Sequence, residues 1–406
     1  MAQLEKGSKK LLNAWAFYDW ANSVYSLVIA SAVFPIFYDE LFPKGSQIGI
    51  FGTTVKSTAL MSFVMAFAFL LVAFMSPLLS GIADYAGNKK SFLKLFCYLG
   101  AISCIGLYWF SPDNMYFSIL CYFFGLVGFW GSLVFYNSYL PDVAYVEQQD
   151  AVSARGYSMG YIGSVVLLVL NLAMVMKPEM FHIDGAMQAM RISFVTVGVW
   201  WILFSQYTYY YLPKGNKQNK VTGDVLLNGF RELRKVWKQI GENIVLKRYL
   251  GAFFVYSMAV QTVMLVATYF GAEEINWGGA EGKRKGLIIS ILLIQLVAVL
   301  GAILTSKLSA KIGNIKALIV INCIWAVICV YAYFVVSPVQ FYITAGFVGL
   351  VMGGIQSLSR STYSKFLPDT TDTASFFSFY DVTEKIGMVI GLILYGAIDQ
   401  IFGSMR

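Results

Sequence analysis

Charged residues are scarce in this sequence. Asp, Glu, Lys and Arg make up 13% of the 406 residues, whereas a soluble domain usually has about 25%. Hydrophobic residues make up 58%, and the mean hydropathy is +0.65. A single buried core cannot absorb this much apolar surface. The composition therefore excludes an ordinary soluble domain and predicts an all-α polytopic membrane protein.

Residues that commonly carry catalysis or bind metals are also rare. The one histidine, His182, lies in a short loop. All five cysteines fall inside hydrophobic runs, and we interpret them as small apolar core residues. We find no Ser nucleophile with a suitably spaced base and no phosphate-binding Walker loop. We therefore expect no enzyme activity, metal or cofactor, and no ATP-driven pumping unless a separate subunit supplies the nucleotide site. A membrane enzyme acting on lipid-linked substrates lacks the same groups.

Long apolar runs dominate what is present. Eleven segments match the roughly 20 apolar residues that a helix needs to cross a bilayer, six before a basic segment at 214–248 and five after it. The predicted spans are Leu12–Leu41, Thr58–Ser80, Ser91–Phe110, Met115–Leu140, Arg155–Met176, Ile192–Leu212, Tyr249–Ala272, Gly286–Leu308, Lys316–Ser337, Val339–Phe366 and Ala374–Phe402.

The basic segment fixes the expected orientation. It holds nine Lys or Arg residues and three acids, and alternation of the spans puts about 21 of the 30 Lys and Arg residues on its side. Loops rich in Lys and Arg remain cytoplasmic, so we expect the N-terminus and residues 214–248 to be cytoplasmic. The net charge of +8 then reflects topology, and we expect no nucleic-acid partner.

Two spans carry a polar stripe at helical spacing. Asp19, Asn22, Ser23 and Ser26 form one, and Gln356, Ser359, Arg360 and Tyr363 form the other. A carboxylate that faces lipid costs at least about 2.5 kcal/mol, so the first stripe should face other helices or water. Interhelical hydrogen bonding and a transport path both explain it. Arg360 either lines such a path or extends to the headgroups.

The last predicted span contains the strongest functional signal. Asp381, Glu384 and Lys385 lie roughly 10–17 Å along the helix, and Asp381 before Lys385 is the favourable order for an intrahelical pair. Glu384 is then left without a partner on its own helix. It is either protonated, paired with Arg360 or Arg155, or bound to a cationic substrate, unless the three form a purely structural network.

Uncharged polar residues extend this candidate pathway. Tyr256 and Gln261 stand near mid-depth in their span, where they bind either a solute or neighbouring helices. The candidate substrate or proton pathway and gate comprises Asp19, Asn22, Asn137, Arg155, Tyr256, Gln261, Gln356, Arg360, Tyr380, Asp381, Glu384 and Lys385.

The turn after the second span reads GIADYAGNKK. It is similar to the Gly-x-x-x-Asp-x-x-Gly-x-Lys/Arg-Lys/Arg loop of major facilitator superfamily transporters. The resemblance implies that Gly81, Asp84, Gly87 and Lys89 lock a cytoplasmic gate. The alternative is an ordinary turn carrying cytoplasmic charge. The matching turn in the second half, KLSAKIGNIK, lacks the acid.

An internal repeat supports a fold in two halves. Leu-Pro-Asp follows the fourth span at 140–142 and the tenth at 367–369, and proline should end both helices there. In the following spans, Gly156, Gly160 and Gly163 lie on one face of the fifth, and Gly387 and Gly391 of the eleventh repeat the four-residue spacing of Gly156 and Gly160. They indicate plain helix packing or, less directly, a sliding contact at a gate.

Several segments together resemble the vacuole effluxer family, the autophagy-related amino-acid exporters and their bacterial relatives. They are NAWAFYDWANSVYS, YNSYLPDVA, SARGYSMGYIG, GGIQSLSRSTYSKFLPD and SFFSFYDVTEKIG. The resemblance covers most of the chain and implies a twelve-helix facilitator fold that exports small solutes, with amino acids assigned for fungal members.

This sequence departs from the expected family pattern in two ways. Glu384 stands where we expect a small residue in relatives, and Leu392 where we expect proline, which puts coupling and substrate in question. The sequence also ends at Arg406, after the eleventh predicted span. We expect a twelfth helix to be missing, and favour a truncated sequence or gene fragment over a natural eleven-span protein.

We therefore predict a major facilitator fold with two helical bundles, at residues 1–213 and 249–406, joined by the basic linker 214–248. Hydrophobic residues at helical spacing predict an amphipathic helix in that linker: Val225, Leu226, Phe230, Leu233 and Trp237. The expected function is secondary active export of a small polar solute, an amino acid, by alternating access with proton coupling. We expect a monomer in the bacterial cytoplasmic membrane. The alternative is a non-transporting membrane receptor or lipid-handling scaffold.

Overall fold

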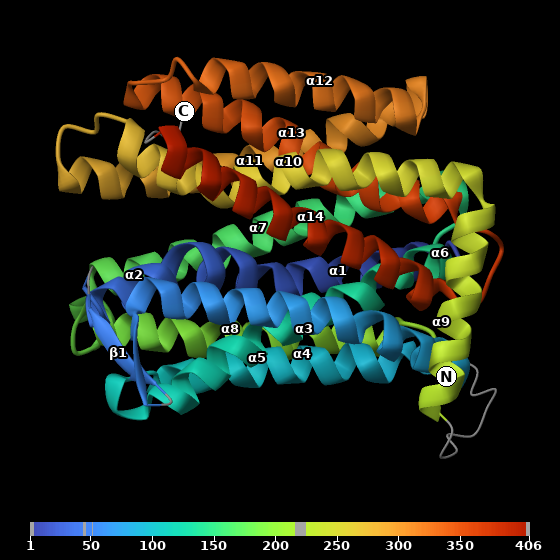
Figure 1. The fold of residues 1–406 in the computed structure, drawn as a ribbon, viewed down its shortest axis with the longest axis horizontal. Helices are drawn as coiled ribbons and strands as arrows, with labels where there is room; N and C mark the ends of the chain where they lie inside the picture. Colours follow the sequence, from blue (N-terminus) through green and yellow to red (C-terminus); the bar gives the residue numbers. More distant parts are fainter. Residues whose placement is uncertain (1–3, 44–45, 51, 216–224, 403–406) are drawn as a thin grey trace.

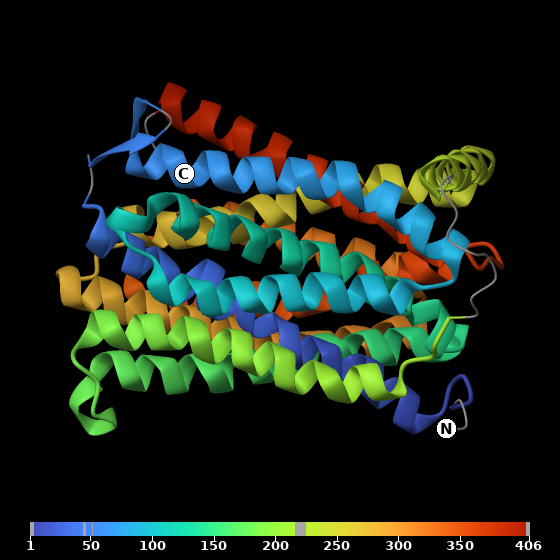
Figure 2. The same ribbon diagram turned by 90° about the horizontal axis from the view of Figure 1, so that it is seen from below.

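The computed structural model describes residues 4–43, 46–50, 52–215 and 225–402, and these are almost entirely helical (Figure 1). The long helices of the first half lie side by side, and each runs antiparallel to the next along the chain (Figures 1 and 2). They are α1 (Lys9–Val24), which continues through η1 (Tyr25–Val33) into α2 (Phe34–Leu41), then α3 (Ser57–Ala86), α4 (Lys89–Gly106), α5 (Met115–Ser138), α7 (Gln149–Met176) and α8 (Ala186–Tyr211). The short helix α6 (Leu140–Val143) follows α5.

The second half has the same construction. Its long helices are α10 (Ile244–Glu274), α11 (Ala280–Ile312), α12 (Asn314–Ala332), α13 (Pro338–Phe366) and α14 (Thr373–Phe402). One hydrophobic core lies largely among the helices of the first half and a second among those of the second half. Helix α10 begins at Ile244, inside the range predicted for the linker.

The predicted spans agree with the helices to within a few residues at most ends. Among the described residues, ten helices are long and apolar enough to cross a membrane. These ten correspond to the first ten predicted spans. The eleventh predicted span corresponds to α14, which is 30 residues long, and its crossing stays a prediction.

Local structure differs from the expectation at three places. The first span contains nine residues of π-helix, η1, in which Ser31 Oγ donates to the Ser26 carbonyl five residues earlier, at 2.8 Å. The following turn forms a small antiparallel hairpin, β1 (Gln47–Ile50) with β2 (Thr53–Lys56), where β-branched residues favour a strand. Cys323 and Cys329 are exposed on α12, so their assignment to the core was wrong.

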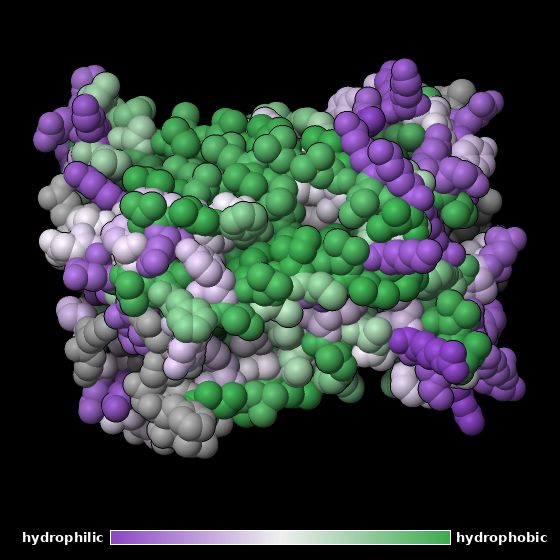
Figure 3. All heavy atoms as spheres, turned by 90° about the horizontal axis from the view of Figure 1, so that it is seen from above, coloured by the Kyte–Doolittle hydropathy of each residue, from purple (hydrophilic) through white to green (hydrophobic). Residues whose placement is uncertain are grey.

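The molecule has two distinct ends. We call the right-hand end of Figure 1, where α6 and α9 lie, the linker end, and the opposite end, with the β-hairpin, the hairpin end. Hydrophobic side chains cover most of the middle of the face in Figure 3, and hydrophilic ones gather towards both ends. This is the surface that a bilayer crossing requires.

The predicted amphipathic helix is present as α9 (Val225–Glu242). It crosses the linker end roughly at right angles to the long helices (Figure 1) and packs mainly against α3, with further contacts to α10 and α14. Its buried face includes Gly229, Val236 and Ile240. The side chains of Val225 and Leu226 lie outside the described residues.

Candidate functional site

Arg360 on α13 inserts its guanidinium between helices of the other bundle and is 1% exposed. Nη1 and Nη2 both donate to Asp19 Oδ2 on α1 at 3.2 Å, and Nη1 also donates to Asn137 Oδ1 at 3.2 Å. Nε donates to Ser153 Oγ at 3.0 Å, and Nη2 to the Ser153 carbonyl at 3.0 Å. One side chain of the second bundle thus binds α1, α5 and α7 of the first.

Aromatic rings enclose the guanidinium. It lies 4.2 Å from the ring centroid of Tyr157, 4.8 Å from Trp15 and 5.4 Å from Tyr136, whose hydroxyl donates to Asp19 Oδ2 at 2.8 Å. Such rings stabilise a cation that has lost its water. Extension of Arg360 to the headgroups is therefore wrong, and the first polar stripe faces other helices as predicted.

Two other predicted pathway residues lie apart from the guanidinium. Asn22 is 1% exposed, one turn from Asp19, and its Oδ1 accepts from Ser23 Oγ at 3.4 Å. Arg155 is exposed and donates to Asn13 on α1, so the structure does not bring it into the cluster around Arg360.

The glycines of the fifth span permit this close packing. A Cβ added at Gly156 would lie 2.4 Å from Asp19 Oδ2, and one at Gly160 would lie 2.4 Å from Ser23 Oγ. On α14, a Cβ at Gly391 would meet Thr262 of α10 at 2.0 Å. Most of these contacts join helices of the same bundle, in agreement with plain helix packing, although a Cβ at Gly156 would also lie 3.0 Å from Arg360 Nη2 of the other bundle.

A second charged cluster lies on α14. Lys385 Nζ donates to Asp381 Oδ1, which confirms the predicted intrahelical pair, and lies 4.4 Å from the ring centroid of Trp130 on α5. Glu384 Oε1 accepts from Gln261 Nε2 of α10 at 2.7 Å. The structure therefore gives Glu384 a neutral amide partner in place of the predicted Arg360 or Arg155. Among the described residues, no group lies within hydrogen-bond distance of the buried Asp381 Oδ2.

Tyrosines and amides occupy the space between these clusters. Tyr161 on α7 donates to Gln356 Oε1 on α13 at 2.6 Å, across the two bundles. The hydroxyls of Tyr256 and Ser359 are 2.7 Å apart, and the ring of Tyr380 stacks on Phe253 at 4.1 Å. Tyr256, Gln356 and Tyr380 thus line one polar–aromatic interior with the charged residues.

The loop motif contacts the opposite bundle. Asp84 Oδ2 accepts from the backbone N–H of Ser375 at 2.7 Å and Oδ1 from that of Ala374 at 3.2 Å, at the start of α14. Lys89 Nζ donates to Thr373 Oγ1 at 2.6 Å and pairs with Asp142 of its own bundle. A carboxylate at a helix N-terminus is favoured by the free N–H groups there.

The two motif glycines have structural roles. Gly87 ends α3 in the left-handed conformation at φ +61°, which favours glycine. A Cβ at Gly81 would lie 2.5 Å from the Gly229 carbonyl oxygen, so this glycine lets α9 approach α3. Asp84, Gly87, Lys89 and Gly81 all lie at the linker end.

A matching contact closes the other side of the linker end. Asp150, near the start of α7, accepts from Lys365 Nζ at 2.6 Å, Asn314 Nδ2 at 2.9 Å and Ser309 Oγ at 3.1 Å. Asn314 belongs to the turn that lacks its acid in the second half. The first bundle supplies that acid instead, from Asp150, five residues before the predicted start of the fifth span at Arg155.

Helix α9 adds a contact from the linker. Lys235 Nζ donates to Asp372 Oδ2 at 2.8 Å and to Glu232 Oε1 at 2.7 Å. These bonds, chiefly the one to Asp372, raise the pKa of Lys235 above its usual 10.5, while burial raises the pKa of Glu232. Because the pKa of Lys235 is higher in the folded protein than in the unfolded chain, the contact stabilises the fold at every pH below the unfolded value. That stabilisation is lost only as the pH rises through the folded value. The contact therefore persists at neutral pH.

Sequence reasoning missed Asp150, Ser153, Tyr157, Tyr161 and Trp130. Asp150 and Ser153 precede the predicted start of their span at Arg155, so their place in a helix was not seen. Nothing in the residues next to the three aromatic side chains shows that a cation or an amide lies opposite them in another helix.

The family follows from comparison with known proteins. The description "Vacuole effluxer Atg22 like" matches residues 7–406. The chain belongs to this family. A Bacillus subtilis relative described as an uncharacterized MFS-type transporter, YxiO, is 31% identical, covering 97% of this chain and 89% of the relative. Autophagy-related protein 22-1 of Phaeosphaeria nodorum is 21% identical, covering 97% of this chain and 86% of its own length.

Solved structures place this Atg22-like chain in the major facilitator fold. A variant of the Escherichia coli fucose:proton symporter FucP has a TM-score of 0.68 at 14% identity, covering 98% of this chain and 92% of that one. A bacterial homologue of ferroportin in an outward-facing state has a TM-score of 0.64 at 12% identity, with 98% and 92% covered. The family match, the YxiO relative and this fold together make the Atg22-like protein a multi-pass membrane transporter of the facilitator superfamily and not an enzyme.

Proposed function

We propose that this transporter exports an amino acid or a similar small polar solute by alternating access, coupled to protons. The contacts of Arg360, Asp84 and Asp150 join the two bundles at or towards the linker end. The proposed cycle breaks them so that the solute can enter, and re-forms them before release at the hairpin end. With the N-terminus and linker cytoplasmic in the bacterial cytoplasmic membrane, that direction is export.

The charge balance of the interior carries this proposal. Asp19, Arg360, Asp381 and Lys385 form two pairs, each with one acid and one base. Glu384 is left with the amide of Gln261. An acid whose hydrogen-bond partner is neutral can bind a proton or an ammonium group, and Lys385 nearby can meet a carboxylate. An amino acid carries both groups.

Reconstituted liposomes with a pH-sensitive dye inside test the proposal. Amino acids are screened for counterflow and for substrate-driven proton movement, with Glu384→Gln as the variant and Glu384→Asp as the conservative control. We expect Glu384→Gln to lose proton movement and the pH dependence of transport, and Glu384→Asp to keep both.

The proton assignment is wrong if Glu384→Gln keeps both. The gate assignment is wrong if Asp381→Asn/Glu384→Gln leaves transport and its pH dependence intact. Binding without counterflow would favour a receptor or scaffold.

A further inference from the structure

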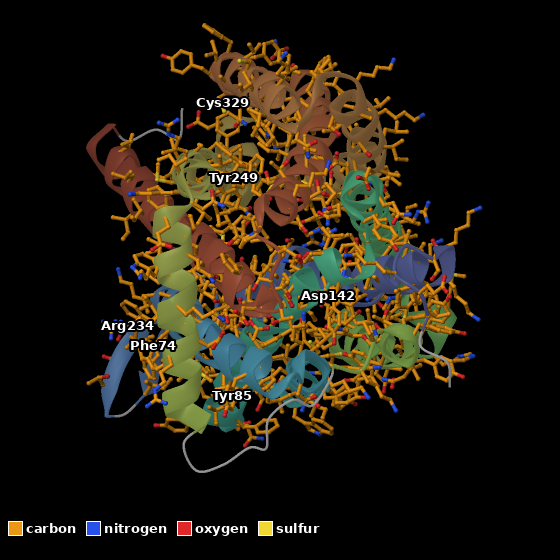
Figure 4. The ribbon with its side chains drawn as sticks, turned by 90° about the vertical axis from the view of Figure 1, so that its right-hand side faces the viewer. Phe74, Tyr85, Asp142, Arg234, Tyr249 and Cys329 are labelled. Atoms are coloured by element: carbon orange, nitrogen blue, oxygen red, sulfur yellow. The ribbon has the colours of Figure 1, made fainter. Side chains whose placement is uncertain are left out.

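Helix α9 presents a face of aromatic and cationic side chains away from the bundles. Phe230 is 56% and Trp237 65% exposed, and Arg234 and Lys238 are exposed beside them. We call these four residues the outer face of α9. Figure 4 shows Arg234 on the side of α9 away from Asp142 and the bundle interior. This face is therefore open to whatever surrounds the linker end.

The outer face lies where the lipid-facing surface begins. The Trp237 ring is 5.4 Å from that of Phe379 on α14. Ile386 lies seven residues after Phe379 on α14, and with the exposed residues Ile390 and Ile393 it continues the same side of the helix into the apolar belt. Trp237 therefore sits at the border between the belt and the polar linker end, the depth at which tryptophan is enriched.

The other end of α9 reaches a second apolar surface. Gly229 packs on α3, whose outer side carries Phe67, Leu70 and Phe74 at 60–75% exposure. Because α3 and α14 pack against each other across the bundles, α9 lies over the seam between them. An amphipathic helix in this position lies in the plane of the membrane surface.

The chemistry of the outer face selects its partner. Arg234, Trp237 and Lys238 line one open, shallow surface along α9. The acid in that lining, Glu242, is 3.8 Å from Lys238, and both side chains are mostly exposed, so their pairing is weak. Cations beside an aromatic ring at membrane depth match a phosphate that carries acyl chains.

We propose that the outer face of α9 binds the headgroup of an acidic phospholipid. Arg234 and Lys238 meet the phosphate, and Trp237 with Phe379 packs against the first part of the acyl chain. Since Lys235 on the same helix holds Asp372, a bound lipid keeps α9 over the α3–α14 seam and favours a closed linker end. This role does not depend on which solute is carried.

The test uses the full chain in detergent and its thermal unfolding midpoint, because a ligand of the folded state raises that midpoint. Dioctanoyl-phosphatidylglycerol is titrated against dioctanoyl-phosphatidylcholine and against free glycerol 3-phosphate. The charge-reversal variant is Arg234→Glu/Lys238→Glu. The matched control is Lys307→Glu/Lys311→Glu, two exposed cations one turn apart near the linker end of α11.

Phosphatidylglycerol should raise the midpoint of the wild type at concentrations where the other two probes do not. The charge reversal should lower the apparent affinity for it about ten-fold or more, since each cation near an acidic surface contributes to binding. The control should keep the wild-type response, and Trp237→Ala should reduce it. The proposal is overturned if the charge-reversal variant keeps the preference for phosphatidylglycerol, or if the control variant loses that preference equally. It is also overturned if glycerol 3-phosphate raises the midpoint as well as phosphatidylglycerol does.

Discussion

At the scale of single residues, the two buried cations differ in how far the sequence could predict their partners. Lys385 pairs with Asp381 four residues away, a spacing that is visible in the sequence. Arg360 pairs with Asp19, 341 positions earlier in the chain. The polar stripes predicted that both residues face protein, but nothing in one sequence selects that partner.

Replacing Asp19 with asparagine should destabilise the protein strongly. The substitution leaves the Arg360 guanidinium buried without its counter-charge, and breaking a buried pair from one side costs about 3 kcal/mol or more. We expect a clear fall in the thermal unfolding midpoint of the purified protein. Arg155→Ala is the control, since this exposed arginine on α7 should change stability by no more than about 0.5 kcal/mol. Equal midpoints for the two variants would show that the pair contributes little.

At the scale of helices, the hydrophobic pattern predicted well which helices exist and in what order they follow one another. The ends of the helices were predicted less exactly. Helix α7 begins six residues before the predicted start of the fifth span, and this extra stretch includes Asp150 and Ser153. The π-helical stretch of η1 was not predicted, because apolar composition is the same for α- and π-helix. The position of α9 over α3 depends on Gly81 and Gly229, whose contact no local pattern reports.

Gly81→Ala should displace α9 from α3. The added Cβ would lie 2.5 Å from a backbone oxygen of Gly229, a contact that real Cβ atoms do not make, so one helix must shift. Val236 lies fully buried on the inner face of α9. We expect a cysteine at this position to react with a thiol reagent faster in the Gly81→Ala variant than in the protein that keeps Gly81. The measurement uses a background with Cys323 and Cys329 replaced by serine.

The matched control for this experiment is Gly251→Ala on α10, where an added Cβ would meet nothing within 4 Å. In the Gly251→Ala variant, the cysteine at Val236 should react at the same rate as in the protein without either alanine substitution. If both alanine variants behave alike, α9 is not held by its approach to α3.

At the scale of the whole molecule, two contacts on opposite sides of the linker end hold it closed. On one side the first bundle offers Asp84 to the start of α14, and on the other it offers Asp150 to Asn314 and Lys365. The sequence suggested that the second half lacked its acid. The tertiary structure shows that both acids come from the first bundle.

Reversing the charge of Asp150 should loosen the linker end. Asp150→Lys faces Lys365, so we expect a cysteine at Ser361, fully buried on α13, to label about 10-fold faster, the factor that about 1.4 kcal/mol produces. Adding Lys365→Asp should restore slow labelling, again in the background without Cys323 and Cys329. If the double variant labels as fast as the single one, the pair does not hold the bundles together.

The sequence by itself determined that this chain lies in a membrane, how its helices follow one another, and which of its spans carry polar groups. These features depend on composition and on spacing along one helix, because the cost of exposing apolar or charged side chains to the wrong solvent is set residue by residue. Only the tertiary structure decided that Arg360 joins Asp19, that Glu384 meets Gln261, and that Asp150 replaces the missing acid. Each of these contacts depends on how separate helices pack, and packing distance is independent of separation along the chain.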